Sequence, residues 1–366
     1  MENSITKGCR VKMGDQLTLL ADDEVFGLNA KLKSEWLLSR LNDLTRHHVE
    51  NCQPYANLLK GMGYAQVAGS LGEVPFVHTR LFKLLELMSI DRNAVFKTLQ
   101  SSGTTSSGKS KIFLDAHTAR LQMKVLTQIL QHFTGRQRRA MLIVDLPPVQ
   151  GGETLSARNA GSNGLAFLGR NHCYAMNTDG EIDLDAVKSF FSSHRHEPIL
   201  IFGFTFMLWQ FVTTCRDNNL KESLNDAVFL HSGGWKKMLA QQVDNETFKM
   251  AVRTQFGADI KIHNFYGMAE QTGTVFVECE KSYLHAPAYA HIIVRDEQTF
   301  SELDENQQGL IQVLSALPES YPGHSILTED LGTIYGEDDC LCGRKGRYFN
   351  VMGRQVVSEV RGCSDV

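Results

Sequence analysis

A run of glycine, hydroxyl and lysine residues at 101–111, SSGTTSSGKSK, has a composition suited to binding phosphate. Backbone amides and hydroxyl groups of a glycine-rich turn can surround phosphate oxygens, and a lysine adds positive charge. Residues 103–110 also satisfy the Walker A pattern, and Asp145 follows an apolar run as a Walker B acid would. A Walker loop requires a helix to begin at its lysine, but 110–114 looks extended and a helix cap comes only at Asp115. We therefore expect a phosphate-binding loop of another kind, with a P-loop or a surface loop without function as the alternatives.

Three cysteines and one histidine form a second set, with the pattern C-x₅-H…C-x-C: Cys279, His285, Cys340 and Cys342. Three thiolates and one imidazole complete a tetrahedral zinc site without an open position, so the metal would be structural. Buried cysteines that bind no metal are the alternative interpretation.

Alternating strands and helices are expected to position these residues. Apolar runs at 140–145, 198–204 and 227–234 predict buried strands, and helical segments such as 245–256 fall between them. Such alternation favours a largely parallel sheet covered by helices. The predicted fold class is therefore α/β.

Two helices have recognisable start signals. Leucines at helical spacing in SEWLLSRLNDL (34–44) predict a helix capped by Ser34. Asp115 is the expected cap of a second helix, which begins at about Ala116 and ends at Gly135.

Three parts are predicted along the chain. Residues 1–275 form an α/β portion, mainly helical in its first hundred residues, and 276–354 form a β-rich subdomain of short strands and turns. Residues 355–366 form a short tail that carries Cys363.

Composition excludes several classes of protein. The chain has 366 residues, of which 42% are hydrophobic and 21% charged, and these fractions are ordinary for a globular protein. A net charge of −4 gives no reason to expect nucleic acid as a partner. No apolar run is long enough to span a bilayer, and the N-terminus lacks the apolar segment of a secretory signal. We expect a cytoplasmic enzyme whose eight cysteines serve as metal ligands, buried thiols or a nucleophile rather than as disulfides. An oligomer is possible.

The glycine-rich loop and four later segments resemble, in the same order, the signature motifs of the adenylate-forming superfamily, which contains acyl-CoA synthetases, adenylation domains and luciferase. The similar segments are SSGTTSSGKSKI (101–112), SGGW (232–235), NFYGMAEQTG (264–273), TEDLG (328–332) and CGRKGRYFNVMGR (342–354). This resemblance implies the fold of the superfamily's N-terminal domain, with helix-covered, largely parallel sheets and a small β-rich subdomain. Because the sequence stops soon after Gly353, we expect it to lack the usual C-terminal domain.

The same resemblance implies a role for each motif in binding ATP and Mg²⁺. Residues of the glycine-rich loop would hold the phosphates: Ser102, Gly103, Thr104, Thr105 and Lys109. The adenine would contact the two glycine-containing turns: Gly233, Gly234, Tyr266 and Gly267. Glu270 would bind Mg²⁺ together with the hydroxyl of Thr104, and the remaining nucleotide contacts would come from Asp330 on the ribose and from Arg344.

A narrower resemblance is to LuxE-type acyl-protein synthetases, the acyl-activating component of fatty-acid reductase complexes in bacterial luminescence. The segments that carry it are FKTLQSSGT (96–104), GFTFMLW (203–209), FYGMAEQTG (265–273), CLCGRKG (340–346) and VRGCSDV (360–366). It implies that a fatty acid is activated as acyl-AMP with release of pyrophosphate. Cys363 would then accept the acyl group and deliver it to an acyl reductase of the LuxC type.

Three other functions remain open at the level of sequence. The chain could be an acyl-CoA ligase of the phenylacetate-CoA ligase type, a branch in which similar Cys/His sets occur. It could instead be a P-loop NTPase or a non-catalytic acyl-binding scaffold, although the intact Glu270 and Asp330 disfavour a scaffold.

Overall fold

The computed structural model describes residues 17, 19–64, 67–100, 109–148 and 164–354. The chain divides into two units. Unit 1 comprises residues 1–99, 111–125 and 286–366, and unit 2 comprises residues 100–110 and 126–285. The tail with Cys363 and most of the glycine-rich loop lie outside the described residues, and the predicted boundary near residue 275 stays a prediction.

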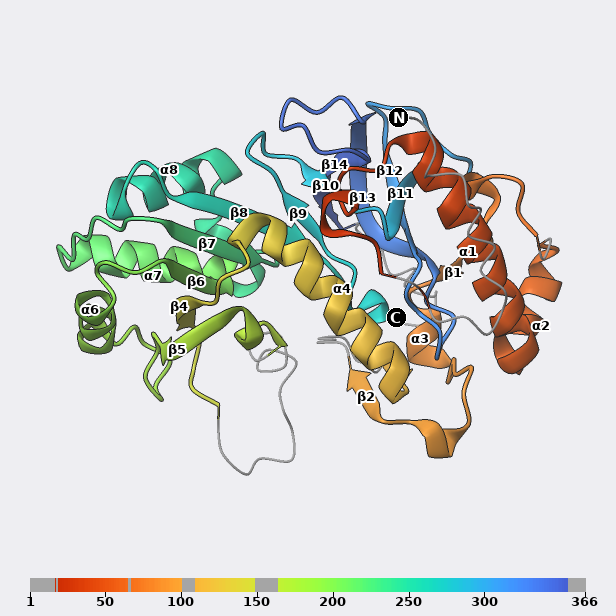
Figure 1. The fold of residues 1–366 in the computed structure, drawn as a ribbon, viewed down its shortest axis with the longest axis horizontal. Coiled ribbons are helices and arrows are strands. Elements are labelled where there is room, and N and C mark those ends of the chain that lie inside the picture. Colours follow the sequence, from red (N-terminus) through yellow and green to blue (C-terminus); the bar gives the residue numbers. More distant parts are fainter. Residues whose placement is uncertain (1–16, 18, 65–66, 101–108, 149–163, 355–366) are drawn as a thin grey trace, which may run out of the picture. The chain divides into compact units, whose positions relative to one another are not determined.

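Unit 2 is built on a sheet whose strand order is β5-β4-β6-β7-β8-β9-β10 (Figure 1). The first five strands are parallel: β4 (Arg139–Val144), β5 (Gly169–Tyr174), β6 (Ile199–Phe204), β7 (Ala227–Ser232) and β8 (Lys261–Tyr266). Two short antiparallel strands follow: β9 (Phe276–Glu278) and β10 (Leu284–His285). This confirms the predicted parallel sheet, and the three apolar runs are β4, β6 and β7 almost residue for residue.

Helices of unit 2 cover this sheet and form one apolar core with its strands. They are α6 (Leu184–Ser193), α7 (Thr205–Asp217) and α8 (Asn245–Phe256), with the 3₁₀ turns η4 (Ala166–Leu168), η5 (Lys236–Gln241) and η6 (Ala269–Gln271). Phe211 of α7 and Phe256 of α8 are fully buried and stack with their ring planes 5° apart. Helix α8 has the predicted bounds because Asp244 caps its start and Gly257, at φ 131°, ends it.

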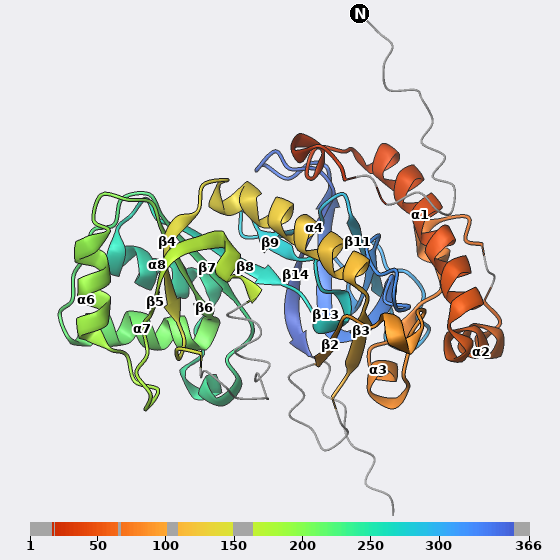
Figure 2. The ribbon, with the colours of Figure 1, turned by 60° about the horizontal axis from the view of Figure 1, so that its bottom comes forward.

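Unit 1 contains an antiparallel sheet of long strands (Figure 2). Its strands are β11 (Ala290–Arg295), β12 (Gln308–Ser315), β13 (Ser325–Glu337) and β14 (Arg347–Arg354), and β1 (Val77–His78) pairs in parallel with β13. A separate pair is formed by β2 (Lys97–Gln100) and β3 (Lys111–Leu114). Residues 276–354 form the strands β9 to β14 and no helix.

Helices of unit 1 come mostly from its N-terminal part. They are α1 (Ala30–Asn51), α2 (Gln53–Met62), α3 (Leu81–Leu84) and the first part of α4 (Ala116–Thr134), with the 3₁₀ turns η1 (Asp22–Glu24), η2 (Leu71–Glu73) and η3 (Arg92–Ala94). The start of α4 is as predicted, since Asp115 Oδ1 accepts a hydrogen bond from the amide of Thr118 at 2.7 Å. Among the described residues, no helix combines the length and the apolar composition that crossing a bilayer requires.

The predicted start of α1 at Ser34 is wrong. The cap is Asn29, five residues before Ser34, and its Oδ1 accepts a hydrogen bond from the amide of Leu32 at 3.0 Å. Asp338, distant in sequence, accepts a further hydrogen bond from the amide of Ala30 at 2.7 Å. This second contact could not be read from local sequence, because it depends on a loop some three hundred residues away.

Two buried histidines make the stability of unit 1 sensitive to acid. The rings of His48 and His324 stack with centroids 5.0 Å apart, and each ring binds a neutral partner, Ser89 or Thr45. Burial lowers the pKa of His324 to about 3 and holds the pKa of His48 well below its usual range. The unfolded chain therefore binds protons that the folded chain does not, and stability falls as the pH drops below about 6.5.

We expect each of these histidines to cost about 1.4 kcal/mol of stability between pH 7.5 and 5.5. Urea unfolding at the two pH values should show that His324→Gln reduces this loss of stability by about 1.4 kcal/mol. The exposed His196 provides the control, since His196→Gln should leave the pH dependence unchanged. An identical loss in His324→Gln and in the unmodified protein would contradict this explanation.

Candidate active site and metal centre

The predicted adenine-binding turns follow neighbouring strands of unit 2. Strand β7 ends at Ser232, directly before Gly233 and Gly234, and its neighbour β8 ends at Tyr266, directly before Gly267. The pairing of Ser232 with Phe265 places both turns at the carboxyl edge of the parallel strands. Ligands of open parallel sheets bind outside this edge, so the structure brings these predicted residues to the edge where such ligands bind.

The turn after β7 has a conformation that requires glycine. Gly233 has φ 79°, and a Cβ at this position would lie 3.3 Å from a ring carbon of Phe204. The hydroxyl of Thr205, the first residue of α7, donates to the carbonyl of Ser232 at 3.2 Å. Gly234 is exposed, and a Cβ there would meet nothing within 4 Å. The turn is therefore anchored at the carbonyl of Ser232, whereas Gly234 is exposed to solvent.

Glu270 lies on the 3₁₀ turn η6 and is only 7% exposed. Hydrogen bonds within the turn support it, since the amide of Gln271 donates to Met268 O at 3.2 Å and the hydroxyl of Thr272 donates to Ala269 O at 3.0 Å. A buried carboxylate is uncommon unless it is paired with donors or a cation. Its burial is compatible with the predicted role as a Mg²⁺ ligand.

The predicted ribose and nucleotide contacts lie in unit 1. Asp330 is in β13, and its amide donates to the hydroxyl of Thr328 at 3.1 Å. Its Oδ1 also lies 3.2 Å from Nε of Arg354, which is its register partner on β14. Arg354 was not among the predicted site residues, although it is the last residue of the matching segment 342–354.

Arg344 lies in a loop that several contacts hold in place. The amide of Gly346 donates to Asp338 Oδ1 at 2.7 Å, and the amide of Lys345 donates to Phe26 O at 2.8 Å. Because Asp338 also binds the first turn of α1, the loop and this helix share one anchor.

The glycine-rich loop is described only at its end. Ser102, Gly103, Thr104 and Thr105 lie outside the described residues, whereas Lys109 is exposed. Ser110 is buried and is followed by the extended strand β3, so no helix begins at the GKS sequence. The Walker A interpretation is therefore wrong, and Asp145 instead accepts a hydrogen bond from the amide of Leu146 at 2.7 Å.

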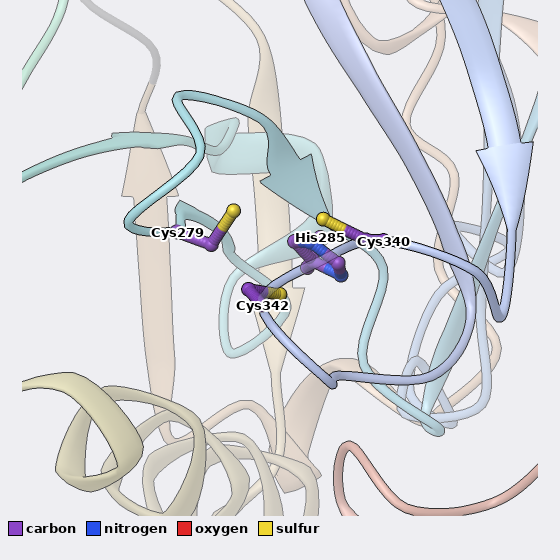
Figure 3. Close-up of side chains that lie close together, drawn as sticks. All are labelled: Cys279, His285, Cys340 and Cys342. Carbon is purple, nitrogen blue, oxygen red and sulfur yellow. The ribbon is translucent and has the colours of Figure 1, made fainter.

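The four predicted metal ligands form one cluster (Figure 3). The three sulfur atoms and a ring nitrogen of His285 all lie within 4.8 Å of one another, and all except Cys342 are buried. Ligand atoms of a tetrahedral zinc site lie about 3.3–3.8 Å apart, as zinc–ligand bonds of about 2.0–2.3 Å require. The widest ligand–ligand separation would therefore need to contract by about 1–1.5 Å at most to bind zinc.

Two tight turns present the cysteines of the cluster. Cys279 O accepts from the amide of Ser282 at 3.0 Å, and the amide of Lys281 donates to Cys279 Sγ at 3.3 Å. In the second turn, Cys340 O accepts from the amide of Gly343 at 2.9 Å, with Gly343 at φ 84°. An amide that donates to sulfur favours the thiolate, which is the form that binds metal. The donor set and the turns both fit a structural zinc ion.

Comparison with known proteins gives the family. A family model described as "Acyl-protein synthetase, LuxE" matches residues 13–366. The chain belongs to the LuxE acyl-protein synthetase family. It is similar to a "Long-chain-fatty-acid--luciferin-component ligase" of Vibrio harveyi, at 22% identity over 90% of this chain and 89% of the relative. A protein of the same name from Aliivibrio fischeri is 22% identical over 78% of this chain and 76% of its own length.

Solved structures of similar fold are adenylate-forming ligases. An open conformation of 2-hydroxyisobutyryl-CoA ligase, in complex with 2-HIB-AMP and CoA, superposes with a TM-score of 0.69 at 15% identity, over 93% of this chain and 80% of the ligase. The same ligase in its postadenylation state gives a TM-score of 0.67, over 91% of this chain and 69% of the ligase. The predicted adenylate-forming α/β fold of this LuxE family member is confirmed.

Family and fold together make this LuxE family member an AMP-forming acyl-protein synthetase that activates its acyl substrate with ATP. A buried ion pair in its interior was not predicted from the sequence. In unit 2, Lys249 of α8 forms an ion pair with Glu278 of β9, and the two side chains are 5% and 3% exposed. Asn245 also donates to this carboxylate at 2.7 Å, and Lys249 donates to the hydroxyl of Ser282 at 2.8 Å.

Proposed function

We propose that this acyl-protein synthetase converts a long-chain fatty acid to acyl-AMP, transfers the acyl group to its own Cys363 and delivers it to an acyl reductase of the LuxC type. The family match over residues 13–366 is the observation that carries this proposal. The long-chain substrate is taken from the names of the two bacterial relatives.

In the first step, a carboxylate oxygen of the fatty acid attacks the α-phosphorus of ATP, and the bond from this phosphorus to the departing pyrophosphate breaks. Ser102, Gly103, Thr104 and Thr105, together with Lys109, bind the phosphates and the developing charge. Gly233, Gly234 and Tyr266 hold the adenine beside the carboxyl edge of the sheet. Asp330 accepts hydrogen bonds from the ribose, and Arg344 contacts the nucleotide. Mg²⁺, when bound by Glu270 and Thr104, supplies charge neutralisation at the phosphates.

In the second step, the thiolate of Cys363 attacks the acyl carbonyl carbon, and AMP leaves with the electron pair of the broken carbon–oxygen bond. The thiol proton passes to solvent. The resulting thioester keeps the acyl group activated and carries it to the reductase.

A single labelling experiment tests this sequence of steps. Incubation with ATP and labelled fatty acids of several chain lengths should yield equal amounts of AMP and pyrophosphate, and peptide mass mapping should locate the acyl group on Cys363. Cys363→Ala should retain pyrophosphate exchange but lose the acylated peptide. Cys173→Ala, which replaces a half-buried thiol, should keep both.

Other products would identify other functions. Free acyl-CoA formed when CoA is added would indicate an acyl-CoA ligase, and ADP with phosphate would indicate an NTPase. Complete absence of carboxylate-dependent exchange would indicate a non-catalytic scaffold. Undiminished acylation of Cys363→Ala would exclude the tail thiol as acceptor.

We further propose that Cys279, His285, Cys340 and Cys342 bind one structural zinc ion. With four protein ligands, the zinc would contribute to folding rather than to the reaction. Metal analysis should find one zinc per chain, and Cys340→Ser should lose it together with several degrees of thermal stability. Cys215→Ser, which alters a buried cysteine outside the cluster, should retain the zinc. Metal-free protein of unchanged stability would rule the zinc out.

A further inference from the structure

A row of polar side chains crosses the interior of unit 2 at one register of the sheet. Strand pairing places His231 of β7 opposite Asn264 of β8. Glu278 of β9 continues the row, since its Oε2 accepts from the amide of Asn264 at 3.3 Å. We call these residues, with their partners at the two ends, the polar row: Thr205, His231, Asn264, Glu278 and Lys249.

The row lies on the face of the sheet that α7 and α8 cover. Side chains alternate along a strand, so His231 shares its face with Phe229, and Asn264 shares its face with Ile262. Phe229 and Ile262 belong to the core that α7 and α8 complete. The ring of His231 also lies 4.6 Å from the ring of Phe248 in α8.

The hydrogen bonds of Thr205 indicate which ring nitrogen of His231 carries a hydrogen. The hydroxyl of Thr205 has a single hydrogen, which it donates to the carbonyl of Ser232 at 3.2 Å. In the tautomer that satisfies both contacts, Thr205 accepts from Nδ1–H of His231, which lies 2.9 Å from the hydroxyl oxygen. Burial, with a further effect of Lys249, lowers the pKa of His231 to about 3, so the ring is neutral. Its Nε2 is then a hydrogen-bond acceptor.

Two buried acceptors stand side by side in the middle of the row. Within the part of the chain that the structure describes, neither His231 Nε2 nor Asn264 Oδ1 has a hydrogen-bond partner. The two atoms cannot bind each other because neither carries a hydrogen. A buried acceptor left unsatisfied costs about 1–3 kcal/mol, and proteins commonly satisfy such groups with an internal water.

One end of the row contacts the segment before the Gly233 turn, and the other end contacts the turn of Cys279 in the metal cluster. At one end, Thr205 holds the carbonyl that precedes the Gly233 turn. At the other end, Lys249 donates to Ser282, the residue that closes the turn of Cys279.

We propose that the polar row positions the Ser232–Gly234 turn for the nucleotide, with Thr205 and His231 as positioning residues and one internal water that donates to His231 Nε2 and Asn264 Oδ1. This inference rests on the proposed function only in assigning the turn to ATP. The row itself is a property of unit 2.

Kinetics of pyrophosphate exchange test the positioning role. Thr205→Val preserves the shape of the side chain but removes the hydroxyl, and it should raise the KM for ATP about 10-fold while leaving the KM for fatty acid unchanged. Thr205→Ser, which keeps the hydroxyl, should have the same KM for ATP as the unmodified protein. Thr213→Val is the matched control, because the hydroxyl of Thr213 bonds within α7, to Trp209 O at 2.9 Å. A lower unfolding midpoint in Thr205→Val with both KM values unchanged would overturn the role.

Nitrogen NMR of ¹⁵N-histidine-labelled protein tests the row without any reliance on activity. At pH 5, several buried rings should be neutral, and His231→Gln should remove one signal with protonated Nδ1 and unprotonated Nε2 from this set. A charged ring, or a protonated Nε2 on His231, would overturn the row even in an active enzyme. Absence of pyrophosphate exchange combined with the expected NMR signal would instead refute the proposed function. A high-resolution crystal structure should show the water within about 2.7–3.2 Å of both acceptors, and direct contact between a rotated Asn264 amide and Nε2 would exclude it.

Discussion

Glu278→Gln is expected to lower the free energy of unfolding by about 3–5 kcal/mol. The substitution keeps the size of the side chain but removes the buried counter-charge of Lys249, whose side chain is only 5% exposed. The remaining carboxylate, on Glu246, lies 3.9 Å from the ammonium and is 74% exposed, so it compensates the charge only weakly. An uncompensated buried charge loses its hydration and gains no equivalent interaction, whereas the intact pair receives support from Asn245 and Ser282. Urea unfolding followed by circular dichroism would measure the loss.

Removing both charges separates this effect from a simple loss of packing. The double variant Lys249→Met with Glu278→Gln should recover much of the stability, because no buried charge remains. Asp217→Asn provides a surface control: its ion pair with Arg216 is 63% exposed on both sides and should contribute less than about 1 kcal/mol. If Glu278→Gln and Asp217→Asn had equally small effects, the pair would not be buried in solution.

Glu270→Gln is expected to slow acyl-adenylate formation by about 10²–10³-fold. The carboxylate is buried on a turn directly after the Tyr266–Gly267 segment, where it would bind the Mg²⁺ that neutralises the phosphates. Charge stabilisation by a metal contributes several kcal/mol to a transition state, and each 1.4 kcal/mol corresponds to a factor of ten in rate. Carboxylate-dependent exchange of labelled pyrophosphate into ATP would measure the change.

Stability and an exposed glutamate provide the controls for Glu270. The unfolding midpoint should change little, since the amide of glutamine fills the same volume. Glu305→Gln, at an exposed position of unit 1, should leave exchange unaffected. Full activity of Glu270→Gln at low Mg²⁺ concentration would show that this carboxylate is not a metal ligand.

Local sequence determined most of the secondary structure. Asp115 caps α4 as expected, and Asp244 caps α8 at its predicted start, because a capping side chain bonds an amide only three positions away. The apolar runs became β4, β6 and β7, since strands buried on both faces need apolar side chains at every position. The extended conformation after Ser110 followed from residues 111–114, and it excluded the Walker loop.

Tertiary structure alone decided the contacts between segments far apart in the sequence. The Asp338 anchor of α1, the pair of Arg354 with Asp330 and the ion pair of Lys249 with Glu278 each depend on which strands and loops become neighbours. The polar row has the same origin, because its members become neighbours only through the register of three strands, β7, β8 and β9, and the packing of α7 and α8 on them. The family motifs indicated the residues that we propose to bind the nucleotide, since motifs of this kind reflect shared chemistry. They could not name the residues that hold the motifs in place, because burial and pairing arise only when the chain has folded.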